Sequence, residues 1–424
     1  MINFETPDDG DGLRFAGNAG VRFVRTDITS SGTTMVPTVG TLGIQAPYEN
    51  VLDPNDPNVI ITQGRCAVRQ PPPGAPPGTA PARPGGVCNL GPAGYAQLQQ
   101  WAGATATLIP DVAENDYTYI LPSFNARLGV TDDLLFRFAV SKVLTRPESS
   151  YIRNFVNIGI DGNGNLTASV GNPYLKPATA WQADLTAEWY FDRVGSLTFN
   201  AFYKRVNNFF YQAVVPFDIS NNGITLPVTT RGPANFDGTG KIKGFEVAYQ
   251  HTFDFLPGFL SGLGVNTNYS YIESSGLPNT FLNTGSPVNQ GSIPPGNLPL
   301  EGLSKHNVNA SVFYENELVS LRAAYNWRSR FLLTAADVIF PYTSIFNEPT
   351  GQLDASIFFN INENLKFGVQ GVNLLNEVTE TSQAFTGDPD RLAPRSYFMN
   401  DRRFSFIVLD GHLGRRGLEQ HFAT

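Results

Sequence analysis

The sequence predicts an all-β protein whose strands form an antiparallel transmembrane β-barrel with long extracellular loops and short periplasmic turns. Three observations lead to this prediction. Apolar and polar residues alternate over about 12 segments, short and long connections alternate between those segments, and only 16% of the 424 residues are charged while Phe contributes 31 and Gly 41. Aromatic residues favour strands and Gly favours turns. No apolar run approaches the length of a membrane-spanning helix, which excludes a helical membrane protein.

The clearest alternation lies at residues 181–191, where Trp181, Leu185 and Trp189 share one parity and Asp184 and Glu188 share the other. A period of two places these sets on opposite faces of a strand. The same pattern defines the remaining strands. In chain order, the twelve predicted strands are residues 13–26, 117–128, 134–145, 181–191, 197–210, 240–253, 262–273, 305–315, 318–329, 351–361, 365–374 and 402–409.

The second of these strands changes parity part-way. Tyr117, Tyr119 and Leu121 share one parity, whereas Phe124 and the apolar residues after it take the other. Proline within a strand is confined to edges and bulges. We therefore expect a β-bulge at Pro122 and Ser123.

The connections fall into two alternating classes. The short ones are residues 131–133, 192–196, 254–261, 316–317 and 362–364, and the long ones are about 27–114, 146–180, 211–239, 274–304, 330–350 and 375–401. Outer-membrane barrels have short periplasmic turns and long extracellular loops. This orientation makes residues 1–5 the lower end of a preceding strand and residues 7–12 its turn.

The two parities give the predicted wall two different faces. The outward set supplies a lipid-facing belt that includes Phe15, Phe23, Phe138, Leu185, Phe199, Val247, Leu263, Val312, Tyr325, Ile357, Phe367 and Phe406. The inward set is polar. Its predicted lumen-lining residues are Arg22, Arg137, Asp184, Glu188, Glu246, Arg322, Arg328 and Asp354.

Cys66 and Cys88 are the two cysteines of the chain, and they flank a Pro-rich segment that has no means of packing itself. We expect a disulfide that closes a surface loop in an oxidising compartment; the alternative is two unrelated thiols.

Four stretches resemble TonB-dependent outer-membrane receptors, in particular those of Caulobacter- and Xanthomonas-like bacteria. They are LLFRFAVSKVLTRP (134–147), GNPYLKP (171–177), GKIKGFE (240–246) and GVNLLNE (371–377). The resemblance implies a 22-stranded barrel filled by an N-terminal plug that carries a TonB box. Neither the plug nor the box is recognisable in this sequence. The similarity therefore corresponds to the C-terminal half of such a barrel.

This resemblance divides the chain into residues 1–12, the end of a preceding strand and a periplasmic turn, residues 13–409, the C-terminal part of the barrel, and residues 410–424. The last segment is an atypical tail, because the family closes its final strand with a terminal aromatic residue and this chain ends at Ala423 and Thr424.

The resemblance also implies a function and partners. It implies energy-coupled uptake of a carbohydrate or a siderophore across the outer membrane of a Gram-negative bacterium. The implied partners are outer-membrane lipid, the barrel-assembly machinery, a small nutrient ligand, and the TonB–ExbB–ExbD system acting through the plug. Without a plug, the chain is expected to be a fragment that cannot transport alone.

Ligand capture is expected in the long loops, because aromatic faces suit sugar rings or flat siderophore groups. The candidate binding residues are Tyr48, Tyr95, Trp101, Tyr151, Phe155, Tyr174, Phe331 and Tyr342. These aromatics could equally pack against one another. The segment 161–165 alternates Asp161, Asn163 and Asn165 like the start of a calcium loop, but Leu166 and Asn172 replace the Gly and Glu that such a loop needs, so a tight turn is the expectation.

Other classes of protein receive less support from the sequence. The four histidines are scattered without metal-ligand spacing, no nucleophile or phosphate-loop motif occurs, and a net charge of −8 without a basic stripe argues against nucleic-acid binding. We therefore expect no enzyme, no metal and no cofactor. Two alternatives remain open: a plug-less passive pore, and a soluble all-β lectin-like or enzyme domain.

Overall fold

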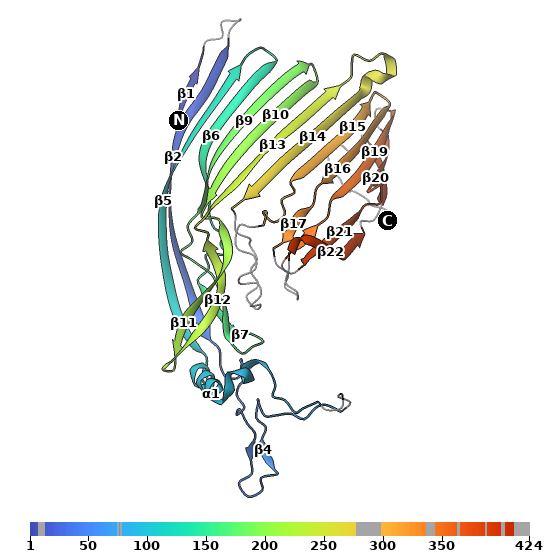
Figure 1. Cartoon of the computed structure of the whole chain (residues 1–424). Helices are drawn as coiled ribbons and strands as arrows, with labels where there is room; N and C mark the ends of the chain where they lie inside the picture. The colour runs from blue at the N-terminus through green and yellow to red at the C-terminus, as the bar shows by residue number, and fades with distance from the viewer. Residues whose placement is uncertain are drawn as a thin grey trace.

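The computed structural model of the chain describes residues 1–6, 13–73, 76, 79–276, 298–335, 344–362, 365–385, 388–399 and 403–410. All structural statements below concern these residues. The largest assembly is a sheet of 17 strands, curved along its length (Figure 1).

Thirteen of these strands form the main wall, each antiparallel to the next along the chain. They are β1 (Ile2–Glu5), β2 (Arg14–Val36), β5 (Thr107–Gly129), β6 (Leu134–Thr145), β9 (Ala178–Asp192), β10 (Gly195–Asn207), β13 (Thr239–Thr252), β14 (Leu263–Ser275), β15 (His306–Glu315), β16 (Val319–Arg328), β19 (Thr350–Asn362), β20 (Leu365–Val372) and β23 (Arg403–Asp410). Each of the twelve predicted segments overlaps one of the strands from β2 to β23, and β1 lies within residues 1–5, where the sequence predicts a further strand.

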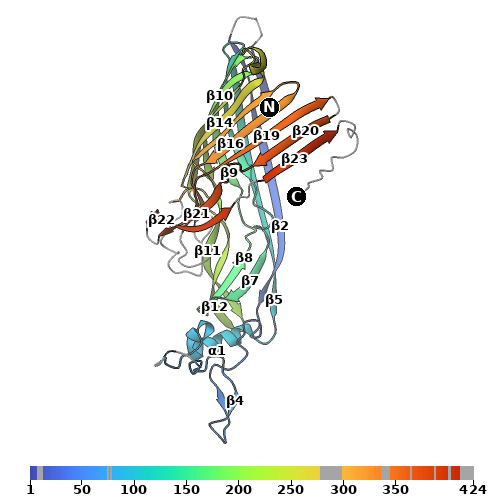
Figure 2. The same ribbon diagram turned by 90° about the vertical axis from the view of Figure 1, so that its right-hand side faces the viewer.

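The wall does not close into a barrel. Among the described residues β1 pairs with β2 alone and β23 pairs with β20 alone, so both remain edge strands. Figure 2 shows the same wall turned by 90°, with α1 and β4 beyond β11 and β12 at the long-loop end.

The expected β-bulge at Pro122 and Ser123 is wrong. β2 and β5 pair without a register shift from Arg14↔Gly129 to Val36↔Thr107, and Val21 faces Pro122 within this run. The outward set of β5 is therefore continuous from Ile120 through Phe124, and Tyr117, Tyr119 and Leu121 lie on the polar face. The pairing of β5 with β6 ends at Ser123, so Pro122 has a neighbouring strand, β2, on one side only. Proline lacks a backbone N–H, and at this position no hydrogen bond to β6 is lost.

The boundaries of three strands also differ from the expectation by several residues. β2 and β5 each run for 23 residues and extend well beyond the predicted strands. The added residues of β2 (27–36) are rich in Thr and Ser, and those of β5 (107–116) include Pro110 and three acidic residues. Neither segment has a regular apolar alternation, although Thr favours strands. The predicted strand 197–210 ends at Asn207, because Asn208 adopts a positive φ of 55° before β11 begins.

The long loops contain regular structure of their own. Four strands extend the sheet at this end: β7 (Phe155–Ile160), β8 (Leu166–Val170), β11 (Phe210–Asn221) and β12 (Ile224–Asn235). β7 pairs with β2, and β12 pairs with β8. A separate four-stranded sheet contains β17 (Phe331–Thr334), β18 (Ile345–Asn347), β21 (Val378–Phe385) and β22 (Asp388–Met399).

The first long loop folds against the β7–β8 and β11–β12 hairpins. It contains β3 (Val51–Leu52), β4 (Ile60–Thr62), the 3₁₀ helix η1 (Gly86–Leu90) and the helix α1 (Gly91–Ala102). We call this loop and the two hairpins the loop module. Its core contains residues from every part of it, including Ile44, Cys66, Trp101, Ile158 and Val228. A second 3₁₀ helix, η2 (Gly258–Gly262), lies at the opposite, short-turn end of the wall.

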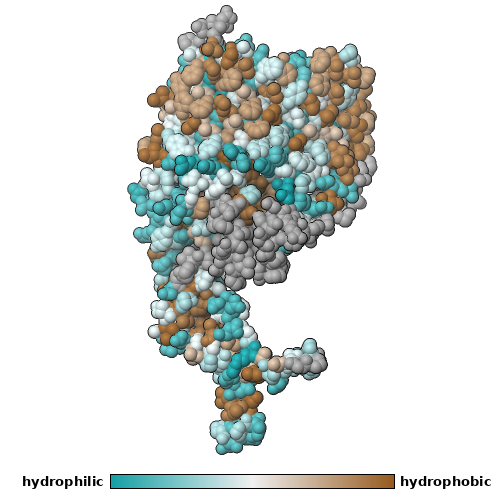
Figure 3. Space-filling view, in the orientation of Figure 1, coloured by the Kyte–Doolittle hydropathy of each residue, from teal (hydrophilic) through white to brown (hydrophobic). Residues whose placement is uncertain are grey.

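Many outward residues of the wall remain exposed. Phe23 is 72% exposed, Leu185 50% and Val312 49%. Figure 3 shows apolar residues gathered over the short-turn half of the wall, with more polar residues toward the long-loop end. No described helix is long and apolar enough to cross a membrane.

Candidate functional site

The polar face of the wall, which we call the inner face, collects residues from many strands. Cross-strand partners share a face, so the register decides which side chains lie together. Arg127 faces Arg137, Ala139 faces Asp184, Leu135 faces Glu188, and Ala324 faces Asp354. Following this register from β2 to β19 places all eight of the predicted lumen-lining residues on the inner face: Arg22, Arg137, Asp184, Glu188, Glu246, Arg322, Arg328 and Asp354.

An ionic cluster lies on this face near the short turns. Arg127 and Arg137 are direct cross-strand partners, an arrangement that is unfavourable for like charges. Glu188 relieves it, because its Oε1 accepts a 2.7 Å hydrogen bond from Arg137 Nε while its Oε2 accepts one of 2.9 Å from the Tyr190 hydroxyl. The cluster is a wetted surface ion pair rather than a buried one, since the Arg137 side chain is 50% exposed.

Two hollows open on the wall, and their chemistry differs. The first has a volume of about 780 Å³, and its lining includes Glu5, Asn125, Arg127, Arg137 and Asp184. We call it the charged hollow. The second has a volume of about 540 Å³ and lies nearer the long loops, at the ends of β14 and β16 and the starts of β15 and β19.

The second hollow is lined mainly by neutral polar side chains. Asn307, Asn309, Asn326 and Gln352 supply carboxamides, and Arg328 is the single charged residue among the described residues of the lining. We call it the amide hollow. Of these residues, Asn326 and Arg328 can be assigned to the inner face from the sequence, by parity within their strand. The alternation of Asn307 and Asn309 is visible in the sequence, but the neighbours of their strand and its register are not.

Trp101 and Tyr95 do not have the exposed position expected of ligand-binding residues. Tyr95 is 1% exposed and Trp101 is 0% exposed, both within the core of the loop module. The Tyr95 hydroxyl donates a 2.9 Å hydrogen bond to the Ala46 carbonyl, and Trp101 Nε1 donates one of 3.0 Å to the Ile219 carbonyl. Burial also raises the pKa of the Tyr95 phenol. Both side chains therefore pack within the core of the loop module.

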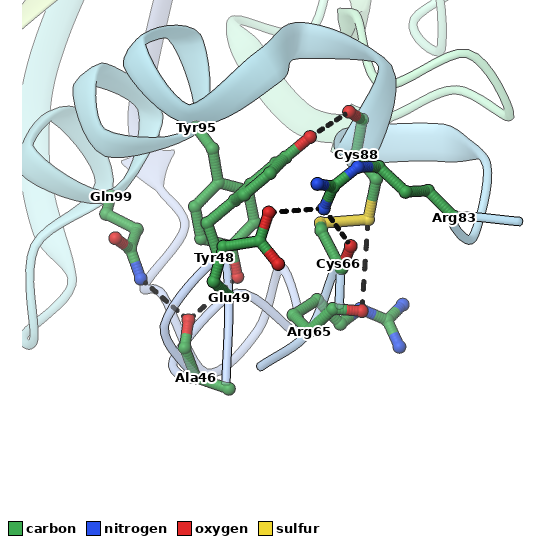
Figure 4. Close-up of a disulfide and its surroundings, with 9 residues drawn as sticks. All are labelled: Ala46, Tyr48, Glu49, Arg65, Cys66, Arg83, Cys88, Tyr95 and Gln99. Carbon is green, nitrogen blue, oxygen red and sulfur yellow. Dashed lines mark hydrogen bonds and ion pairs between the residues drawn. A yellow bond between two sulfur atoms is a disulfide. The ribbon is translucent and has the colours of Figure 1, made fainter. Parts of the chain in front are cut away.

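Cys66 and Cys88 form a disulfide with their Cα atoms 5.3 Å apart, and both residues are buried. Figure 4 shows its surroundings. The Tyr48 hydroxyl donates a 2.9 Å hydrogen bond to the Cys88 carbonyl, and Arg83 Nη1 donates one of 2.7 Å to the Cys66 carbonyl. The Arg83 guanidinium also pairs with Glu49 and lies over the Tyr48 ring. Tyr48 thus belongs to the support of the disulfide.

The other candidate aromatics are scattered. Tyr151 packs edge-on against Phe210, Arg153 lies over the Phe155 ring, and Tyr174 is 61% exposed. Phe331 is buried beneath the Arg328 guanidinium at the edge of the amide hollow. Tyr342 lies outside the described residues. The structure therefore does not gather the seven predicted aromatics that it describes into one binding site.

The segment 161–165 forms the turn between β7 and β8. Asp161 Oδ1 accepts 2.9 Å hydrogen bonds from the backbone N–H groups of Asn163 and Asn165, and Gly164 has a φ of 94°. These contacts are those of the expected tight turn. No group of three or more metal-binding side chains occurs among the described residues.

Comparison with protein families identifies the wall. The model described as "TonB dependent receptor-like, beta-barrel" matches residues 10–374, more than half of the chain. This chain belongs to the TonB-dependent receptor family. TonB-dependent receptors are transport proteins rather than enzymes, in agreement with the sequence prediction. No curated protein matches the chain.

Solved structures that resemble the chain include a ferric enterobactin receptor, a siderophore receptor and a ferric-catecholate import receptor. A ferric enterobactin receptor mutant (Q482A) from Pseudomonas aeruginosa, in complex with enterobactin, has a TM-score of 0.50 at 11% identity over 96% of this chain and 52% of its own. The siderophore receptor PirA from Acinetobacter baumannii scores 0.48 at 11% identity over 71% and 43%. The ferric-catecholate import receptor Fiu from E. coli scores 0.46 at 14% over 93% and 42%. The chain spans about half the length of the structures it matches.

Proposed function

We propose that this chain forms part of the wall of an outer-membrane receptor that takes up a small nutrient, of the carbohydrate or siderophore class, in a Gram-negative bacterium. The observation that carries the proposal is the opposite chemistry of the two faces. The outer face exposes large apolar side chains such as Phe23 and Leu185, whereas the inner face carries Arg137, Glu188 and the amide hollow. Lipid on one side and water on the other explains this arrangement.

The exposed apolar face disfavours a soluble lectin-like or enzyme domain, because such a domain would expose these large apolar side chains to water. In the proposed setting, outer-membrane lipid contacts this face and the barrel-assembly machinery inserts the wall. A small nutrient ligand is the partner on the inner side, and no basic surface suggests nucleic acid.

We further propose that additional strands pair with both edges of the wall in the working receptor. In lipid, the backbone N–H and C=O groups at the edges of β1 and β23 would lack partners. Energy from the TonB–ExbB–ExbD system would act through a plug domain, which is not among the elements that the structure describes. We therefore propose that the chain alone is not competent for transport.

The test is expression of this chain in a Gram-negative host that lacks related receptors. We expect the protein in the outer-membrane fraction, released by detergent and not by salt, and no energy-dependent uptake of labelled sugars or ferric siderophores. Recovery in the soluble fraction would refute the membrane assignment. Robust uptake that stops when tonB is deleted would refute the claim that the chain cannot transport alone.

A further inference from the structure

The amide hollow lies where a ligand entering between the long loops would meet the inner face. It opens at the end of β14, which leads into the connection 276–305, and at the end of β16, which leads into the connection 329–349. The charged hollow lies nearer the short turns, since Arg137 and Arg127 flank the turn between β5 and β6. A ligand that enters from the long-loop end therefore reaches the amide hollow first.

Three carboxamides of the hollow and the neighbouring Asn268 form a continuous row across four neighbouring strands. Asn268 on β14 faces Asn309 on β15, Asn309 faces Asn326 on β16, and Asn326 faces Gln352 on β19. Asn309 Nδ2 donates a 3.3 Å hydrogen bond to Asn268 Oδ1, which orients these two amides. Asn309 and Asn326, in the middle of the row, are exposed to the hollow.

A second row runs parallel to the first, one step closer to the long loops. Ser270 faces Asn307, Asn307 faces Arg328, and Arg328 faces Thr350. The Arg328 guanidinium lies 4.5 Å above the centre of the Phe331 ring, and Phe331 is only 7% exposed. The buried ring therefore holds a planar donor group in place beside the amide row.

The charges around the hollow do not favour an anionic ligand. Arg328 is accompanied on the inner face by two carboxylates. Asp354 accepts hydrogen bonds of 2.9 Å and 3.1 Å from Gln352 Nε2, and Glu246 lies opposite Ser270. A carboxamide offers a donor and an acceptor side by side, as a sugar hydroxyl does. A row of such groups can satisfy both roles of successive hydroxyls without a net charge.

We infer that the amide hollow is a binding site for a neutral polyhydroxylated ligand, an oligosaccharide in chemical class. This inference rests on the proposed receptor function and narrows its ligand. The central amides Asn309 and Asn326 bind the hydroxyls of one sugar unit, and Arg328 donates to a neighbouring pair of hydroxyls. The charged hollow takes no part in this recognition.

The test is calorimetric titration of the full chain in detergent micelles with maltohexaose, xylohexaose and cellohexaose, and with a ferric catecholate as the anionic probe. We expect at least one hexaose to bind, and the double variant Asn309→Leu, Asn326→Leu to weaken that binding at least tenfold. Asn326→Asp conserves size but replaces two donors by a charge, and it should weaken the same binding. The matched control is Asn200→Leu, on the inner face of β10 outside the hollow, which should change the affinity less than twofold.

Far-UV circular dichroism and the melting temperature of each variant show whether the fold is retained. Failure of all three hexaoses to bind would overturn the inference, as would binding that is insensitive to both Asn326 variants. Tight binding of the ferric catecholate without hexaose binding would also overturn it, while leaving the receptor function intact. Recovery of the chain in the soluble fraction would instead reject the receptor function itself.

Discussion

Trp101 joins loops that lie more than a hundred residues apart in the sequence. Its Nε1 donates to the Ile219 carbonyl at 3.0 Å, and its own carbonyl accepts a 2.6 Å hydrogen bond from Asn221 Nδ2. Both partners lie at the end of β11, and the indole is fully buried. One side chain therefore fixes α1 against the β11–β12 hairpin by two polar contacts and by packing.

Replacing Trp101 tests this anchoring role. Trp101→Ala should destabilise the loop module by about 3–5 kcal/mol, because it leaves a large cavity. Trp101→Phe keeps most of the volume and should cost about 1–3 kcal/mol through the unpaired Ile219 carbonyl. The measurement is the rate of proteolytic cleavage within residues 37–106 of the full chain. Tyr174→Ala, at a residue that is 61% exposed, is the control and should leave the rate unchanged. An unchanged cleavage rate in Trp101→Ala would argue against the anchoring role.

The disulfide is the second stabilising feature at this scale. Cys66 and Cys88 are separated by 22 residues, and the chain-entropy model gives about 3 kcal/mol for closing a loop of this size. Cys66→Ser combined with Cys88→Ser should therefore make the module more sensitive to urea and to protease, without changing the assembly of the wall. Unaltered urea sensitivity of the module would show that the buried contacts of Tyr48 and Arg83 are sufficient without the covalent link.

At the scale of the strand, the two faces of β9 and β10 should respond in opposite ways to the same charge. Leu185→Arg places a guanidinium on the outer face, which should cost about 2–4 kcal/mol near the middle of a bilayer. Asn200→Arg, on the inner face of β10 and directly opposite Glu246, should be tolerated. The measurement is the amount of each variant in the outer-membrane fraction. Equal amounts of both variants would contradict the assignment of lipid to the outer face.

The strands of the wall could be predicted from the sequence because one face is apolar and the other polar, which produces a period of two. Strands in which the two faces do not differ in polarity cannot be predicted in this way. In the outer half of β2, Thr and Ser replace the apolar alternation, and in that of β5 acidic residues and Pro110 interrupt it, so the sequence does not predict the full length of either strand. The hairpins of the loop module pack on one another, and their alternation does not stand out from the surrounding loops.

The residues of the candidate site also differ in whether the sequence alone predicts their position. Face assignments such as those of Arg137 and Asp354 follow from parity within a single strand. The amide row requires the register of four strands, because Asn268, Asn309, Asn326 and Gln352 meet only across ladders. Burial of Tyr95 and Trp101 depends on the packing of loops far apart in sequence, which parity does not report. Loop aromatics therefore could not be sorted into packing and binding residues from the sequence.

The described part of the molecule is a curved wall with the disulfide-linked loop module at one end and an unpaired edge at each of β1 and β23. An unpaired strand edge in lipid leaves backbone groups without hydrogen bonds, at a cost of several kcal/mol for each group. Neither β1 nor β23 pairs with a second strand among the described residues. The wall by itself is thus a poor candidate for a sealed pore, although both of its faces suit a membrane setting.

Conductance measurements decide between an open wall and a closed pore. The purified full chain, added to planar lipid bilayers, should give no unitary current steps of constant size, because a sheet with two free edges encloses no channel of fixed diameter. Heat-denatured protein in the same detergent serves as the control for non-specific leak. Uniform, long-lived steps that are absent from the control would show that both edges are paired in lipid, either with each other or with those of a second copy of the chain. The passive-pore alternative would then replace the proposed receptor wall, and the inner-face hollows would line an aqueous channel.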